Sequence, residues 1–122
     1  MREVADEIDR SLQAVGSAEF TRVLQRFFKE EIRAYGCRMK DIERVVKEKL
    51  GNNRPDARRA WEIASQLFSL PYYEPFLAAT LILERAARSL STDDMERLEQ
   101  VIAQRVSNWA ECDAICQRVV RK

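Results

Sequence analysis

Aromatic residues recur along the chain at intervals of 37 residues, and this period constrains the possible folds more than any other feature. The recurring residues are Tyr35, Tyr72 and Trp109. The same shift also aligns apolar positions, such as Leu24 with Trp61. A period of this length is typical of stacked helical hairpins, whose units bury their apolar faces only against one another. About three units are needed for a stable stack, and the chain holds three.

Helical periodicity extends from end to end, without the alternation that is typical of strands. We predict seven helices. The first four are expected over residues 3–15, 18–33, 39–50 and 55–70. The fifth is expected to start near residue 74, the sixth to be capped by residues 91–94, and the seventh to start near residue 108. The first helix is expected to be an extra N-terminal one, followed by hairpins of the second and third, fourth and fifth, and sixth and seventh. The predicted fold class is therefore all-α, a HEAT-like superhelix of stacked antiparallel hairpins in one domain over residues 1–122. The fifth helix is apolar nearly all round and should be the most enclosed.

The composition fits a soluble helical domain. Hydrophobic residues make up 46% and charged residues 34% of the chain, and three glycines with three prolines argue against an all-β chain with many turns. The longest nearly apolar run, Phe76 to Leu83, is about half the length of a membrane-spanning helix. The N-terminus is charged from its second residue, so neither a signal peptide nor a membrane partner is predicted. Because Cys37, Cys112 and Cys116 cannot all pair within one chain, we interpret them as reduced thiols of a cytoplasmic protein.

Positive charge is concentrated in one part of the sequence. Residues 22–59 carry twelve Lys and Arg against six Asp and Glu, whereas the rest carries nine against fourteen. Two rows of cations have helical spacing: Arg22, Arg26, Lys29 and Arg33 on one helix, and Lys40, Arg44 and Lys47 on the next. Such rows suit a phosphate backbone, because each contact releases counterions. The alternative interpretation is two solvated faces with i,i+4 ion pairs to nearby glutamates, and the pattern alone leaves both open.

Most catalytic signatures are absent from the sequence. There is no histidine, which removes Ser–His and Cys–His dyads and most transition-metal sites. Cys112 and Cys116 are one helical turn apart, but further ligands at metal spacing are missing, and both lie on an apolar stripe. Core packing is therefore the preferred interpretation of these cysteines. No glycine-rich phosphate loop occurs, and we expect neither a metal nor a cofactor.

The last predicted helix carries one unusual pair of residues. At 100° per residue, Asp113 lies 40° from Trp109 and one turn along the helix, on the rim of an apolar arc. A carboxylate beside an indole face suits a cationic ligand, through charge and a cation–π contact. The alternative is an aspartate favoured by the helix dipole beside a core tryptophan.

At these residues the chain resembles the AlkD-like DNA alkylation repair proteins, which are DNA glycosylases built from HEAT-like repeats. Tyr35 to Ile42 resembles the family's Tyr-Gly-x-x-x-Pro-x-Leu segment. Trp61 to Ala78 resembles its Trp…His-Glu…Ala-Leu stretch, and Ser107 to Asp113 its Asn-Trp-x-x-x-Asp motif. Lys40 stands where the family usually has proline, and Tyr73 where it often has histidine. The likeness spans roughly residues 18 to 120.

The resemblance implies a DNA glycosylase that hydrolyses the N-glycosidic bond of cationic N3- and N7-alkylated purines in double-stranded DNA. It places Asp113 and Trp109 at the lesion's deoxyribose as catalytic residues. Asp113 would stabilise an oxocarbenium-like sugar and position water, while Trp109 adds cation–π attraction. The expected DNA-binding residues are the cations at the start and along the exposed side of the third helix: Arg38, Lys40, Arg44 and Lys47.

Family members continue through further helices that supply more DNA contacts, including an arginine at the active site. The chain is therefore expected to be the N-terminal part of a longer architecture, inactive alone. The sequence leaves open whether the chain is a fragment, a truncated product or a shortened relative. It also leaves open whether the chain self-associates or receives its C-terminal half from another chain. The alternative function is a non-enzymatic HEAT-like module that binds protein or DNA through its groove.

Overall fold

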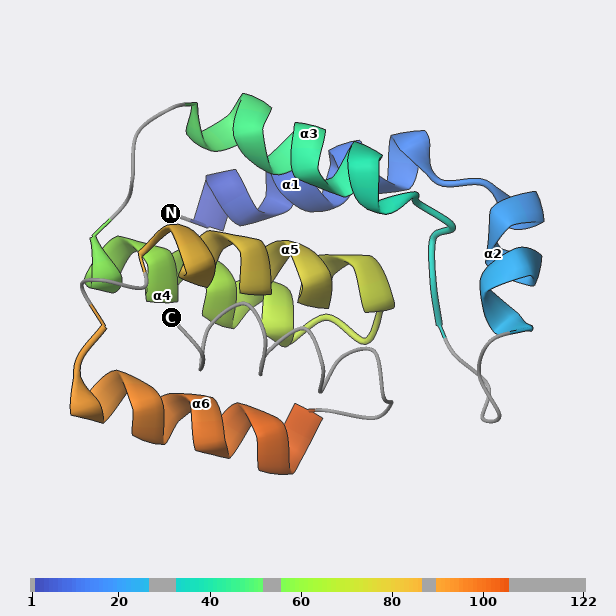
Figure 1. Cartoon of the computed structure of the whole chain (residues 1–122). Coiled ribbons are helices and arrows are strands. Elements are labelled where there is room, and N and C mark those ends of the chain that lie inside the picture. The colour runs from blue at the N-terminus through green and yellow to red at the C-terminus, as the bar shows by residue number, and fades with distance from the viewer. Residues whose placement is uncertain (1, 27–32, 52–55, 87–89, 106–122) are drawn as a thin grey trace.

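The computed structural model describes residues 2–26, 33–51, 56–86 and 90–105, and all the regular secondary structure within them is helical (Figure 1). The six helices are α1 (Arg2–Val15), α2 (Ala18–Gln25), α3 (Met39–Leu50), α4 (Ala57–Phe68), α5 (Tyr73–Arg85) and α6 (Thr92–Arg105). No strand occurs in these ranges, so the predicted all-α class is confirmed. The expected seventh helix lies outside the described residues.

The helices form successive layers, as a repeat architecture requires (Figure 1). The pair α1 and α3 makes one layer, α4 and α5 make the next, and α6 lies beyond α4. Between layers, α1 packs on α4 and α3 packs on α5. Each layer therefore buries its apolar side against the neighbouring one, which is the physical basis of a stacked repeat.

The first layer differs from the predicted hairpin of the second and third helices. Within the described residues, α3 packs on α1, and α2 contributes no buried side chain. The reason lies in α1, which presents Ala5, Ile8 and Leu12 at helical spacing, all buried in the core. These residues occupy the position that the pattern assigned to α2, and α2 lies beside the stack (Figure 1).

Helix α5 is the centre of the core, as predicted from its apolar character. Every residue from Glu74 to Leu83 is buried. Helix α4 lies along it, and its Phe68 ring meets the α5 Phe76 ring edge to face, with centroids 5.0 Å apart. Because α5 contacts α1, α3 and α4, any group fixed to it is fixed to the whole stack.

Candidate nucleic-acid interface

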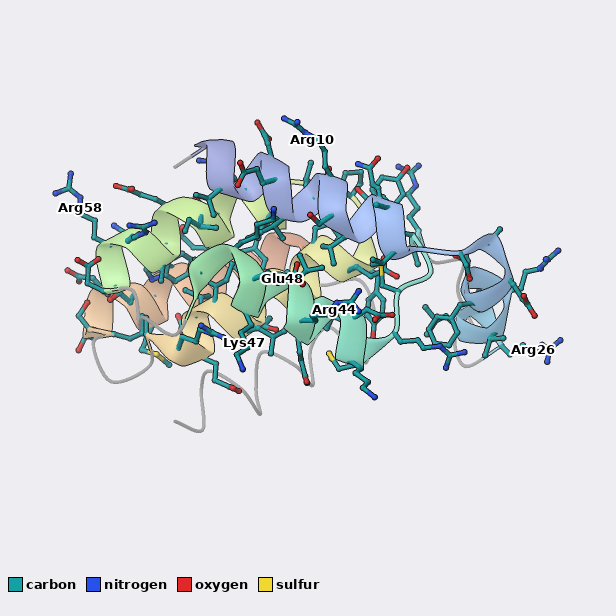
Figure 2. The ribbon with its side chains drawn as sticks, turned by 90° about the horizontal axis from the view of Figure 1, so that it is seen from above. Arg10, Arg26, Arg44, Lys47, Glu48 and Arg58 are labelled. Carbon is teal, nitrogen blue, oxygen red and sulfur yellow. The ribbon has the colours of Figure 1, made fainter. Side chains whose placement is uncertain are left out.

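The predicted basic row of α3 lies on the solvent side of the helix. Lys40, Arg44 and Lys47 are all exposed, and Figure 2 shows Arg44 and Lys47 along α3. The opposite face holds the buried residues Ile42, Val45 and Val46. The prediction from helical spacing that these three cations share one accessible face is confirmed. That they bind DNA stays a prediction.

Acidic side chains compensate much of the charge of this row. The Arg44 guanidinium lies 3.4 Å from the Asp41 carboxylate and 3.9 Å from that of Glu48. Glu43 is exposed on the same helix. Exposed pairs of this kind contribute little to stability, typically about 0–1 kcal/mol, but they reduce the positive potential that an anion would meet. Arg44 therefore fits the alternative interpretation, a solvated helix face with ion pairs to nearby acids.

Arg38 lies apart from this row, at the N-cap position of α3. Its guanidinium carbon lies 4.5 Å from the centroid of the Phe20 ring, which belongs to α2. This geometry is a cation–π contact. Arg38 therefore joins the start of α3 to α2 and remains exposed to solvent.

Residues 33–38 form a strap between α2 and α3, and a buried carboxylate holds it. The Glu74 oxygens accept hydrogen bonds from the backbone N–H groups of Tyr35, Gly36 and Cys37, at 2.8, 2.9 and 3.0 Å. Glu74 is fully buried at the start of α5. Three backbone donors around one anion are the arrangement known as a nest, and here the anion comes from the protein itself.

Further bonds tie the strap to α2 and α5. The Ser17 N–H donates to the Gly36 carbonyl at 3.0 Å, and the Tyr73 N–H donates to the Arg33 carbonyl at 2.8 Å. The Thr21 hydroxyl donates to the Ala34 carbonyl at 3.3 Å. Gly36 has φ +90°, a conformation that side chains rarely adopt. The strap thus fixes how α2 is held relative to the core.

Two of the recurring aromatic residues meet at this strap. The Tyr35 and Tyr72 rings stack with centroids 4.5 Å apart. The Tyr35 hydroxyl donates to the Asp9 carboxylate of α1 at 2.6 Å. Burial, together with that hydrogen bond to Asp9, raises the pKa of the Tyr35 phenol well above its usual range. The phenol is therefore a neutral structural donor at neutral pH.

Cys37 is a buried, free thiol of the strap. Its Sγ lies 3.1 Å from the Leu12 carbonyl oxygen, to which it donates. Burial, reinforced by the Glu74 and Asp41 carboxylates, raises the pKa of this thiol to about 12. The thiolate needed for nucleophilic or redox chemistry is therefore suppressed. Cys112 and Cys116 lie outside the described residues.

The predicted catalytic residues Trp109 and Asp113 also lie outside the described residues, so their assignment stays a prediction. Over the ranges that are described, no group of three potential His, Cys, Asp or Glu ligands is placed to hold a metal. None of the helices in these ranges combines the length and apolar character needed to cross a membrane.

Sequence reasoning missed two features of this region. One is the role of Glu74, although a carboxylate at the start of a nearly wholly apolar helix was a visible signal, because such a charge must find partners. The other is the exposure of α2, for which periodicity carries no signal. An amphipathic pattern says that a face can be buried and does not say which of two such helices is buried.

Comparison with known proteins identifies one family. Residues 8–122 match the family model described as DNA alkylation repair enzyme. The match covers most of the chain, including the strap, α5 and the predicted Trp-Asp motif. Searches of curated proteins and of solved structures give no match.

Proposed function

The chain belongs to the DNA alkylation repair enzyme family, and from that premise we propose that it acts in alkylation repair as a DNA glycosylase. The proposed substrate is a purine alkylated at N3 or N7 in duplex DNA. The family match carries the role in alkylation repair. The finer assignment rests on the chemistry of Asp113 and Trp109.

An alkylated purine of this class carries a positive charge and is already a good leaving group. Hydrolysis of its N-glycosidic bond therefore needs no strong general acid, and a chain without histidine can supply what remains. The developing sugar cation needs a nearby negative charge and a positioned water, the roles proposed for Asp113. The Trp109 indole would add cation–π attraction to the charged base or sugar.

The exposed cations of the described part support the DNA-binding half of this proposal. Arg38, Lys40, Arg44 and Lys47 are all accessible to a phosphate backbone. Contacts of this kind position a duplex without reading its sequence. That suits a repair protein, which must bind DNA wherever a lesion occurs.

A base-release assay on alkylated duplex tests the proposal, using this chain and any longer natural protein that contains it. We expect Asp113→Asn, which keeps shape but removes charge, to slow release of 7-methylpurine by at least about tenfold, or about 1.4 kcal/mol of barrier. DNA affinity should change little. Trp109→Ala should lower both release and affinity.

Asp93→Asn is the matched control, because Asp93 is exposed in the first turn of α6 and should leave release unchanged. An unchanged rate of base release in the Asp113→Asn variant would contradict the catalytic role of Asp113. Duplex binding with no base release in any form would favour the alternative, a non-enzymatic DNA-binding module.

A further inference from the structure

One position of the repeat makes a contact with the part of the chain that precedes its own unit. In the 37-residue register, this position is occupied by Cys37, Glu74 and Glu111. The Cys37 thiol donates to the Leu12 carbonyl in α1. The Glu74 carboxylate accepts from three N–H groups of the strap, those of residues 35–37. In both described units, the side chain at this position therefore ties its unit to what comes before it.

An aromatic ring accompanies this position, two residues earlier in the chain. Tyr72 precedes Glu74 in the second unit, as Trp109 precedes Glu111 in the third. The Tyr72 ring stacks on that of Tyr35, one period before it, with centroids 4.5 Å apart. Where the second unit meets the first, a ring contact and a carboxylate contact thus occur together. The third unit carries both residue types at the same register positions.

The third unit is docked on the second in the same way as the second on the first. Helix α6 packs on α4, as α4 packs on α1. The Arg97 guanidinium carbon of α6 lies 5.8 Å from the centroid of the Trp61 ring of α4. In a repeat protein, each unit contacts its neighbour through equivalent residues. The equivalent docking of these helices therefore favours equivalent contacts for the residues that follow α6.

The start of α5 can accept a carboxylate from the next unit. Its N-cap residue, Tyr72, makes no side-chain cap hydrogen bond, whereas Ser17 and Asp56 cap α2 and α4. The first N–H groups of a helix have no partner within the helix, and a negative charge is favourable there. In the register, the Glu74 N–H is equivalent to the Cys37 N–H, which donates to a carboxylate one period later.

We propose that Tyr72 is a positioning residue for the glycosylase site. It holds the Trp109 ring by stacking, while the Glu111 carboxylate accepts from the N–H groups that open α5. Trp109 and Glu111 lie outside the described residues, so the register of the repeat carries this assignment. Asp113 follows Glu111 by two positions and is thereby fixed relative to α5, the core helix. The inference rests on the proposed function for the roles of Trp109 and Asp113.

A double-mutant cycle between Tyr72→Ala and Trp109→Ala tests the ring contact, with urea unfolding of this chain as the measurement. A stacked aromatic pair should couple the two changes by about 2- to 12-fold in the unfolding equilibrium constant. Tyr72→Phe, which keeps the ring, should retain the coupling. Leu50→Ala is the control partner for Tyr72→Ala, because it lies near the opposite end of α5, where Arg85 binds the Gly51 carbonyl. That pair should be additive.

Amide hydrogen exchange tests the carboxylate contact. Glu111→Ala should lower the protection of the Glu74 N–H by about tenfold or more, because this amide then opens more readily to water. Glu99→Ala is the matched control, since Glu99 is exposed on α6, and it should leave that protection unchanged. Equal protection of the Glu74 N–H in the two variants would contradict the contact with Glu111.

Base release from alkylated duplex, measured at saturating protein with the longer natural form, separates the two proposals. Tyr72→Ala should slow release by about tenfold or more, since a displaced group loses its productive geometry, and Tyr72→Phe should restore the rate. If base is released but Tyr72 and Trp109 are not coupled, or Tyr72→Ala releases base at the normal rate, this inference fails and the glycosylase proposal stands. Coupling without base release in any form overturns the glycosylase proposal and leaves only the contact.

Discussion

Removal of the Glu74 carboxylate is expected to destabilise the protein severely, because three backbone donors depend on it. The N–H groups of Gly36 and Cys37 are buried, and that of Tyr35 is partly buried. A buried donor left without a partner costs about 1–3 kcal/mol. Glu74→Ala should therefore lower the free energy of unfolding by about 3–5 kcal/mol. That is a large share of the total for a small domain, which is about 5–15 kcal/mol.

The desolvation of the carboxylate does not reduce this estimate. Burying an ionised group has its own cost, so the whole arrangement is worth less than its separate hydrogen bonds suggest. Truncation, however, removes the acceptor and leaves the donors in place. Glu74→Gln should give an intermediate loss, because its amide oxygen still accepts but the charge assistance is gone.

Urea unfolding followed by circular dichroism measures both variants. Glu96→Ala is the control, since Glu96 is exposed on α6 and its removal should change stability by less than about 0.5 kcal/mol. A loss below about 1 kcal/mol for Glu74→Ala would show that the strap satisfies its donors in another way, and the proposed anchoring of α2 would then be wrong.

Three further predictions follow from the same region and from the core. Gly36→Ala should cost more than about 3 kcal/mol, because strain at positive φ adds to a clash of the new Cβ with the Ser17 carbonyl. Gly51→Ala, which has positive φ but open space around it, should cost only the strain of about 1–3 kcal/mol; equal urea midpoints for the two would contradict this account. In a variant whose other cysteines are serine, native Cys37 should react with a thiol reagent at pH about 8 at least tenfold more slowly than in denaturant. The pKa of the Cys37 thiol is raised to about 12 in the folded protein. The neutral thiol therefore contributes fully to the free energy of unfolding below the ordinary thiol pKa of about 8.5, and this contribution is lost as pH rises toward 12. Fast labelling of the native state, or a free energy of unfolding that is unchanged between pH about 8 and 10, would refute the burial of this thiol. Leu81→Ala should cost about 2–5 kcal/mol, and a loss under about 1 kcal/mol on unfolding would mean that α5 is not the core helix.

Sequence reasoning succeeded where one residue pattern has one physical solution. The nearly continuous apolar run in α5 has no stable place except the interior, and its residues from Glu74 to Leu83 are indeed buried. The expected helix 39–50 matches α3, Met39–Leu50, because Tyr35 and Gly36 interrupt the helical pattern before it and Gly51 ends it. Arg44 and Lys47 were placed on an exposed face because the opposite face carries the apolar stripe.

The hydrophobic pattern did not predict which helix packs on α3 in the first layer. Helices α1 and α2 are both amphipathic, and either could cover α3 by periodicity alone. The competition is decided by long-range contacts, such as the burial of Ile8 and Leu12 against the stack. The bond from Cys37 N–H to Glu74 likewise spans 37 residues, a pairing that no local propensity encodes.

That span gives the 37-residue period a direct physical meaning. Tyr35 stacks on Tyr72, and Cys37 donates to Glu74, so residues one period apart touch across adjacent layers. The contacts that the period brings together are the ones that fix the strap. Because α1 completes the first layer, α2 contributes no buried side chain, and hydrogen bonds to the strap hold it beside the stack. A helix whose pattern predicts burial but which the fold leaves exposed breaks the agreement between local pattern and structure, and such breaks are expected at functional sites.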